Sequence, residues 1–172
     1  MKILNFEFKA KTKTLEIQEA KLKAESPLYM GEDNQRDTYF NVNMGRLKLR
    51  EGNIENSLIY YERENVTGAK QSDVLLYQHV SNPSLKNILE KVHGIKVIVQ
   101  KKRRIYFIGN VKFHFDLVEG LGTFIEVEAI DKTGNFGIEK LQSQCRTYAD
   151  LFDIKDEDYI SNSYSDLILQ HH

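Results

Sequence analysis

Polar and apolar residues alternate with a period of two over most of six segments, the pattern of β-strands with one polar and one apolar face. The segments are residues 5–11, 45–51, 57–63, 96–107, 110–117 and 122–130. Gly109 and Asn110 supply a turn that would join the fourth and fifth segments into a hairpin. Residues 28–37 and 64–73 are expected to be loops or ragged strand ends.

Three helices are predicted between the strands. The first begins near residue 12 or 14 and ends near residue 24. The second begins at Asn82, a capping residue followed by proline, and ends at Gly94. The third spans residues 138–152, where Cys145 lies on an apolar stripe and is expected in the core. The chain is therefore assigned to the α+β class, with mostly antiparallel strands.

The composition narrows the classes of protein that fit. A length of 172 residues suits one domain, and we treat residues 1–172 as that domain. The formal net charge of −1 argues against a nucleic-acid-coating protein, so no nucleic-acid partner is expected. A single cysteine excludes an intramolecular disulfide. No apolar run reaches the length of a membrane span or a signal peptide, so we expect a cytoplasmic protein without a membrane partner.

The charges on the alternating faces are unusual because each strand tends to carry one sign. Arg46, Lys48 and Arg50 share one face, and Glu126 and Glu128 share another. A merely solvated sheet favours mixed charges, since like charges on one face repel each other. Nine cations stand on such faces, namely Lys9, Lys11, Arg46, Lys48, Arg50, Arg63, Lys101, Arg103 and Lys112, against the four carboxylates of Glu7, Asp116, Glu126 and Glu128.

If these faces converge, they form a basic site that contains a few carboxylates. Polyphosphates need several Lys and Arg donors for their oxygens. Magnesium and manganese ions need hard carboxylate ligands, and such ions bridge phosphoryl oxygens. A basic site alone would bind anions, and the added carboxylates favour a metal–triphosphate ligand.

The order of several short motifs resembles the CYTH superfamily, also called triphosphate tunnel metalloenzymes. The most specific block is residues 116–128, which is similar to the pattern D-x-x-x-G-L-G-x-F-x-E-x-E. The other blocks are residues 5–11, similar to E-x-E-x-K with asparagine first, residues 35–40, similar to Q-x-D-x-Y-F, residues 45–50, residues 101–106 and residues 163–167. Within the superfamily, the sequence most resembles the class IV adenylyl cyclases.

This resemblance implies a closed or nearly closed antiparallel β-barrel with a polar tunnel and helices packed outside. It also implies dependence on Mg²⁺ or Mn²⁺, a triphosphate substrate and a homodimer. The first functional hypothesis is conversion of ATP to cyclic AMP and pyrophosphate. The alternatives are a triphosphatase acting on thiamine triphosphate or inorganic tripolyphosphate, and a non-catalytic protein that binds nucleotides or polyphosphate.

The resemblance also assigns roles to residues by position. Glu7 and Glu126 would hold the metal, helped by Glu128 and Asp116. The groups expected to hold phosphate oxygens are Lys9, Lys11, Arg46, Lys48, Arg50, Lys101 and Arg103, with Arg63 as a further candidate. Lys101, Arg103 and Asp116 are the residues expected to act in the reaction itself.

Some residues depart from the family pattern or lie outside it. Asn5 replaces the first glutamate, so a metal ligand there would be lost or neutral. Alternation directs Lys102 and Arg104 out of the tunnel and places His114 on its inner face. Tyr164 and the preceding serine are interpreted as packing or capping residues.

Overall fold

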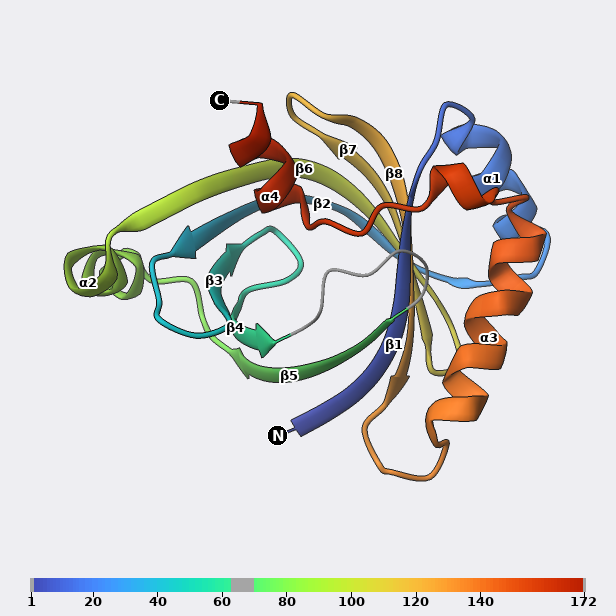
Figure 1. The fold of residues 1–172 in the computed structure, drawn as a ribbon, viewed down its shortest axis with the longest axis horizontal. Coiled ribbons are helices and arrows are strands. Elements are labelled where there is room, and N and C mark those ends of the chain that lie inside the picture. Colours follow the sequence, from blue (N-terminus) through green and yellow to red (C-terminus); the bar gives the residue numbers. More distant parts are fainter. Residues whose placement is uncertain (1, 63–69, 172) are drawn as a thin grey trace.

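The computed structural model describes residues 2–62 and 70–171. The elements in these ranges are β1 (Lys2–Lys11), α1 (Leu15–Lys23), β2 (Leu28–Phe40), β3 (Arg46–Glu51), β4 (Ser57–Glu62), β5 (Lys70–Gln78), α2 (Pro83–His93), β6 (Ile95–Ile108), β7 (Val111–Val118), β8 (Gly122–Asp131), α3 (Ile138–Leu151), a 3₁₀ turn (Asp156–Asp158) and α4 (Tyr164–Gln170). The strands pair antiparallel in the order β1-β5-β4-β3-β2-β6-β7-β8 and close into a barrel (Figure 1). The predicted fold class is confirmed.

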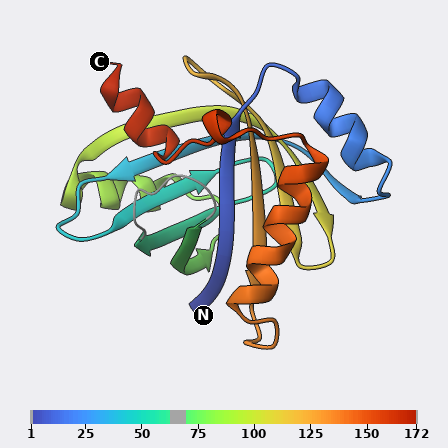
Figure 2. The ribbon, with the colours of Figure 1, turned by 45° about the vertical axis from the view of Figure 1, so that its right-hand side comes forward.

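The main hydrophobic core lies outside the barrel, between its wall and the helices. Phe8, Phe113 and Val127 point outward and pack with Leu141 and Cys145 of α3, and all five are at most 1% exposed. Figure 2 shows α1 and α3 on the same side of the barrel. Burial of each such side chain stabilises the fold by about 1.5–3 kcal/mol. Because the apolar faces point outward, the charged faces of the strands face the interior.

Two strands, β2 and β5, occupy stretches that were expected to be loops or ragged strand ends. In β2, polar residues occupy both faces, since Gln35 and Asp37 are buried whereas Arg36 is exposed. In β5, apolar residues run without interruption over residues 74–77. Neither segment shows the period-two contrast of a half-solvated strand, and the prediction was wrong for residues 28–37, whereas the second stretch overlaps β5 only at residues 70–73. Residues 64–69 of the second stretch lie outside the described residues.

The three predicted helices are confirmed to within a few residues. At the start of α2, the Asn82 side chain accepts a hydrogen bond of 2.9 Å from the Ser84 backbone N–H, and the helix ends at Gly94 with a φ of +74°. No residue of α2 is buried, and the helix projects from the side of the barrel (Figure 1). No helix within the described ranges combines the length and apolar character needed to span a membrane.

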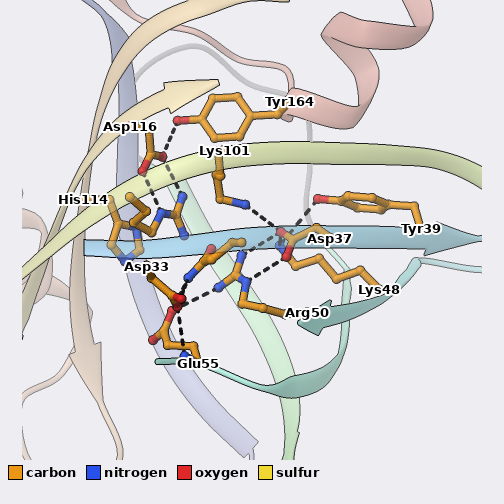
Figure 3. Close-up of polar contacts among 12 residues, drawn as sticks. Asp33, Asp37, Tyr39, Lys48, Arg50, Glu55, Lys101, His114, Asp116 and Tyr164 are labelled. Atoms are coloured by element: carbon orange, nitrogen blue, oxygen red, sulfur yellow. Dashed lines mark hydrogen bonds and ion pairs between the residues drawn. The ribbon is translucent and has the colours of Figure 1, made fainter. Parts of the chain in front are cut away.

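A fourth helix, α4, packs against β6 near one end of the barrel. The Ser163 hydroxyl caps it by accepting a hydrogen bond of 3.2 Å from the Asp166 backbone N–H. This geometry confirms the capping interpretation of Ser163. It also directs Tyr164, the first residue of the helix, into the barrel (Figure 3).

Candidate functional site

The barrel encloses a polar cavity of about 150 Å³, called the tunnel below. Every strand of the barrel contributes inward-facing side chains to its lining. The charged and imidazole groups in that lining are Glu7, Lys9, Asp37, Lys48, Arg50, Glu55, Lys101, Arg103, Lys112, His114, Glu126 and Glu128. The convergence expected from the alternating faces is therefore present.

Asp37 on β2 organises one group of cations. Its carboxylate accepts hydrogen bonds of 2.9 and 2.8 Å from Arg50 and of 2.8 Å from Lys101, and Lys48 Nζ lies 3.4 Å away (Figure 3). Burial raises the pKa of the Asp37 carboxyl, but the three cations outweigh burial and hold that pKa well below its usual range. Asp37 therefore stays ionised and orients three cations toward one point.

Lys101 is the cation whose protonation the tunnel disturbs most. Its side chain is 1% exposed. Burial lowers the pKa of Lys101, and repulsion from Arg103, Arg50 and Lys48 lowers it further. Together they outweigh the attraction of Asp37 and bring this pKa to about 7. An anion entering the tunnel would relieve this repulsion, so anion binding favours protonation of Lys101.

Arg103 on β6 is held by a carboxylate behind it. Asp116 is fully buried and accepts hydrogen bonds of 2.7 and 2.6 Å from Arg103, and its Oδ2 accepts a third of 2.7 Å from the Tyr164 hydroxyl (Figure 3). The Tyr164 ring also lies 3.9 Å from Lys9 Nζ. Asp116 of β7 and Tyr164 of α4 thus hold the side chain of Arg103 in place, and the Tyr164 ring also supports Lys9.

On β8, two glutamates of the same face have different surroundings. Glu126 lies 2.8 Å from Arg103, 3.5 Å from Lys9 and 3.0 Å from Nδ1 of His114. Burial raises the pKa of Glu126, but Lys9 and Arg103 outweigh burial and hold that pKa well below its usual range. Glu128 lies opposite Glu7 in the β1–β8 register, and burial together with Glu7 raises the pKa of Glu128 to about 7. Glu128 thus lacks sufficient positive charge beside it.

These residues fit a divalent cation. His114, Glu126 and Glu128 each offer a ligand atom, and these atoms lie within 4.8 Å of one another. Burial and Arg103 lower the pKa of His114 to about 4, so the ring is neutral and able to donate a lone pair. Nε2 of His114 and Oδ1 of Asn5 are buried without a hydrogen-bond partner among the described residues. Carboxylates and a neutral amide oxygen are ligands that Mg²⁺ and Mn²⁺ accept.

Glu55 reaches the tunnel from the turn between β3 and β4. Asp33 fixes that turn by accepting hydrogen bonds of 2.9 Å from the backbone N–H groups of Ile54 and Glu55. The Glu55 carboxylate then pairs with Lys112 and lies 3.5 Å from Arg50. Burial raises the pKa of Glu55, but Lys112 and Arg50 outweigh burial and keep it ionised. This pair occupies the end of the tunnel away from α4.

The sequence pattern of the CYTH domain family matches residues 4–164, which is most of the chain. The chain belongs to the CYTH family. No curated protein matches it.

Several solved structures share the fold. The PH1012 protein of Pyrococcus horikoshii is 24% identical with a TM-score of 0.77, over 95% of this chain and 98% of that one. A proposed adenylate cyclase of Vibrio parahaemolyticus is 18% identical with a TM-score of 0.76, over 96% and 98% of the two chains. HpAC1 from Hippeastrum, described with a dominant triphosphatase activity, is 15% identical with a TM-score of 0.62, over 99% and 95%.

Of the twelve residues to which the sequence assigned a role, the structure brings eight to the lining of the CYTH tunnel. These are Glu7, Lys9, Lys48, Arg50, Lys101, Arg103, Glu126 and Glu128. Their placement in the lining supports the prediction that these strand faces point inward. Their chemical roles stay predictions.

Three of the other four lie elsewhere in the described residues. Lys11 is exposed beside Phe124, because it is the last residue of β1. Arg46 pairs with Asp166 of α4 at 2.7 Å, outside the tunnel lining. Asp116 lies behind Arg103 rather than in the lining and pairs with it, and its part in the reaction stays a prediction. Arg63 lies outside the described residues.

Sequence reasoning left several lining residues unassigned. Asp37 and Tyr164 lie inside motif blocks that were recognised, and Lys112 and His114 lie on a face that was recognised, so signals for these four existed. Glu55 had no such signal, because its position depends on the turn that Asp33 fixes. With Asp37 and Glu55 included, six Lys and Arg side chains face five carboxylates in the described lining. The cationic excess is therefore smaller than expected.

Proposed function

We propose that this CYTH protein is a divalent-metal-dependent enzyme that acts on a triphosphate held in its tunnel. The observation that carries this proposal is the meeting of six cations with the group formed by His114, Glu126 and Glu128 in one enclosed cavity. Surface charges of either sign are common, but buried cations need anionic partners. The carboxylates of the tunnel supply some of these partners, and a bound triphosphate would add to them.

The charge balance supports a requirement for metal. The six cations already face five carboxylates, so the lining alone cannot neutralise a triphosphate. When bound, a divalent cation would offset the charge of the phosphates and the charge that develops on them during the reaction. Glu7, Glu126 and Glu128 would hold it, with His114 and Asn5 as neutral neighbours.

The chain's own residues would position the phosphates. Arg103, fixed by Asp116, presents a guanidinium that suits two phosphoryl oxygens, and Arg50 is fixed in the same way by Asp37. Lys101 and Lys48 add ammonium groups beside Arg50. Phosphoryl transfer depends mostly on such positioning and electrostatic stabilisation.

The first candidate reaction is cyclisation of ATP, in which the ribose 3′-oxygen bonds to the α-phosphorus and pyrophosphate leaves. The resemblance of residues 105–128, as an ordered match, to class IV adenylyl cyclases supports this candidate. The second candidate is hydrolysis of the terminal phosphate by water. The dominant triphosphatase activity of HpAC1, a protein with the same fold, supports the second.

Product analysis tests these candidates directly. The protein would be incubated with ATP, thiamine triphosphate or tripolyphosphate, with Mn²⁺, with Mg²⁺ and with chelator. Cyclic AMP with pyrophosphate identifies the cyclase, and inorganic phosphate identifies the triphosphatase. No product from any of the three despite metal-dependent binding would contradict the enzymatic proposal and favour a binding protein. The expected single domain over residues 1–172, cytoplasmic location and homodimer stay predictions beside it.

A further inference from the structure

One carboxylate in the tunnel lining comes from a turn rather than a strand and does not belong to the group that fits a metal. Glu55 lies between β3 and β4, and its carboxylate pairs with Lys112 of β7. Its Oε1 lies 3.5 Å from Nη1 of Arg50 and accepts a hydrogen bond of 2.9 Å from Gln35. Glu55 therefore occupies two cations on different sides of the tunnel.

Both cations are placed to serve a phosphate instead. Nε and Nη2 of Arg50 donate to Asp37, so Nη1 is the part of the guanidinium that faces Glu55, and Figure 3 shows Arg50 between these two carboxylates. Lys112 lies opposite Glu128 in the β7–β8 register, beside the group that fits a metal. Carboxylate and phosphate oxygens accept hydrogen bonds from the same Arg and Lys donors. A triphosphate that reaches these donors therefore meets Glu55 as a competitor.

The backbone of this turn is held in place, whereas the Glu55 side chain has room to move. Asp33 accepts hydrogen bonds of 2.9 Å from the backbone N–H groups of Ile54 and Glu55. The side chain of Glu55 is 23% exposed, more than those of Arg50 at 10% and Lys112 at 13%. Glu55 also lines a second cavity of about 710 Å³ that adjoins the tunnel. Rotation of this side chain toward that cavity would release both cations without moving the turn.

We infer that Lys112 and Nη1 of Arg50 bind a phosphate group of the substrate, and that Glu55 holds both cations while the tunnel is empty and is displaced when the substrate binds. The inference rests on the proposed triphosphate site. It adds Lys112 to the phosphate-binding residues and makes Glu55 a competitor within the chain, which weakens the binding of any anion that needs these donors.

A double-mutant cycle between Glu55 and Lys112 tests this displacement. The ligand is the diimido analogue of tripolyphosphate, which resists hydrolysis, and calorimetric titration measures its binding in the presence of Mn²⁺. The proteins are the wild type, Glu55→Gln, Lys112→Met and the double variant, with circular dichroism to check that each is folded. Glu51→Gln is the matched control, because this residue ends β3 beside the same turn and lines neither cavity.

We expect Glu55→Gln to strengthen binding of the analogue roughly tenfold, because the ligand no longer has to break hydrogen bonds between charged groups. Lys112→Met should weaken binding by less than about threefold in the wild type, where the gain of a phosphate contact is offset by the loss of the Glu55 contact. In the Glu55→Gln background the same change should weaken it at least about tenfold, and this difference measures the coupling. Glu51→Gln should stay within about twofold of the wild type.

Equal effects of Lys112→Met in the two backgrounds would overturn the inference and leave the proposed triphosphate site standing, because the pair of Glu55 and Lys112 would then persist in the complex. Unchanged affinity in Glu55→Gln would overturn it too. So would weaker Mn²⁺ binding by this variant without the analogue, measured by electron paramagnetic resonance, since Glu55 would then be a metal ligand. Failure of both the wild type and Glu55→Gln to bind the analogue would contradict the proposed function and, with it, the inference.

Discussion

Asp37 and Glu128 are both carboxyl groups inside one tunnel, yet their surroundings move their pKa values in opposite directions. Asp37 has Arg50 and Lys101 within 2.9 Å, and its pKa lies well below the usual range. Glu128 faces Glu7 across the strands, and its pKa rises to about 7. Burial alone therefore does not decide whether a carboxyl group is ionised. The charged partners that neighbouring strands supply decide it.

The difference separates a structural role from a binding role. Asp37 already has its cations, so it serves to hold them in place. At Glu128, the attraction of Lys112 and Arg103 does not outweigh burial and the repulsion from Glu7, which a divalent ion would relieve. One part of the tunnel is thus prepared for phosphate and the other for metal, and each prediction below tests whether these two parts differ as described.

The largest effect should come from Asp37→Asn. This change leaves Arg50, Lys101 and Lys48 buried without their shared anion, and breaking a buried ion pair costs about 3–5 kcal/mol. The free energy of unfolding in urea, measured without metal, should fall by that amount. Glu128→Gln is the matched control and should leave it unchanged or raise it. Equal destabilisation by both substitutions would contradict the distinction.

Removal of a metal ligand should affect turnover more than folding. Glu126→Gln should lower metal-dependent turnover at least about a hundredfold, since even loss of a group behind a ligand costs 10- to 100-fold. Circular dichroism should remain that of the wild type, and Mn²⁺ binding measured by electron paramagnetic resonance should weaken. Glu119→Gln, at an exposed position after β7, serves as the control. Wild-type turnover in Glu126→Gln would disprove the metal assignment.

Neighbouring lysines on β6 test which strand face binds phosphate. Lys101→Ala should weaken tripolyphosphate binding by about 1.5–3 kcal/mol, the range for hydrogen bonds to charged groups. Lys102→Ala should change it little, because that side chain is exposed on the outer face. Calorimetric titration at constant salt gives both values, and similar losses would mean that the inward face has been assigned wrongly.

The smallest predicted effect is on the number of protons that the protein takes up when tripolyphosphate binds. With its pKa lowered to about 7, Lys101 is largely neutral at pH 8, and binding of tripolyphosphate should recharge it. Titrations at pH 8 in buffers of different ionisation enthalpy should show up to about one more proton taken up by the wild type than by Lys101→Arg, which is always charged. Identical uptake would contradict this role.

The same shift gives a stability trend whose sign can be checked. The unfolded chain holds this proton up to about pH 10.5, whereas the folded protein releases it near pH 7. Since the unfolded state binds more protons between these values, the contribution of Lys101 to stability improves as pH rises from 7 to 10.5 and is least favourable below 7.

The sequence predicted the barrel, its inward faces and most of the lining. The signals that it used, strand faces with charges of one sign and motifs in a fixed order, can be seen in the sequence alone. It did not reveal β2, whose two faces are both polar, or β5, whose apolar residues are consecutive. The pairing of Asp116 with Arg103 and Tyr164 was also not foreseen, since only the folded structure brings these three residues together. Pairings across the barrel depend on register, which alternation does not specify.

The pairing of β1 with β8, called the seam below, determines when the site forms during folding. It joins residues 4–11 to residues 124–131, and contacts this distant in sequence form only after the loss of chain entropy is overcome, which slows folding. Lys9 with Glu126 and Glu7 with Glu128 lie on either side of that seam. A partly folded chain with this seam open therefore lacks Lys9 and Glu7 beside the carboxylates of β8, and the complete site arises in the same step that closes the barrel.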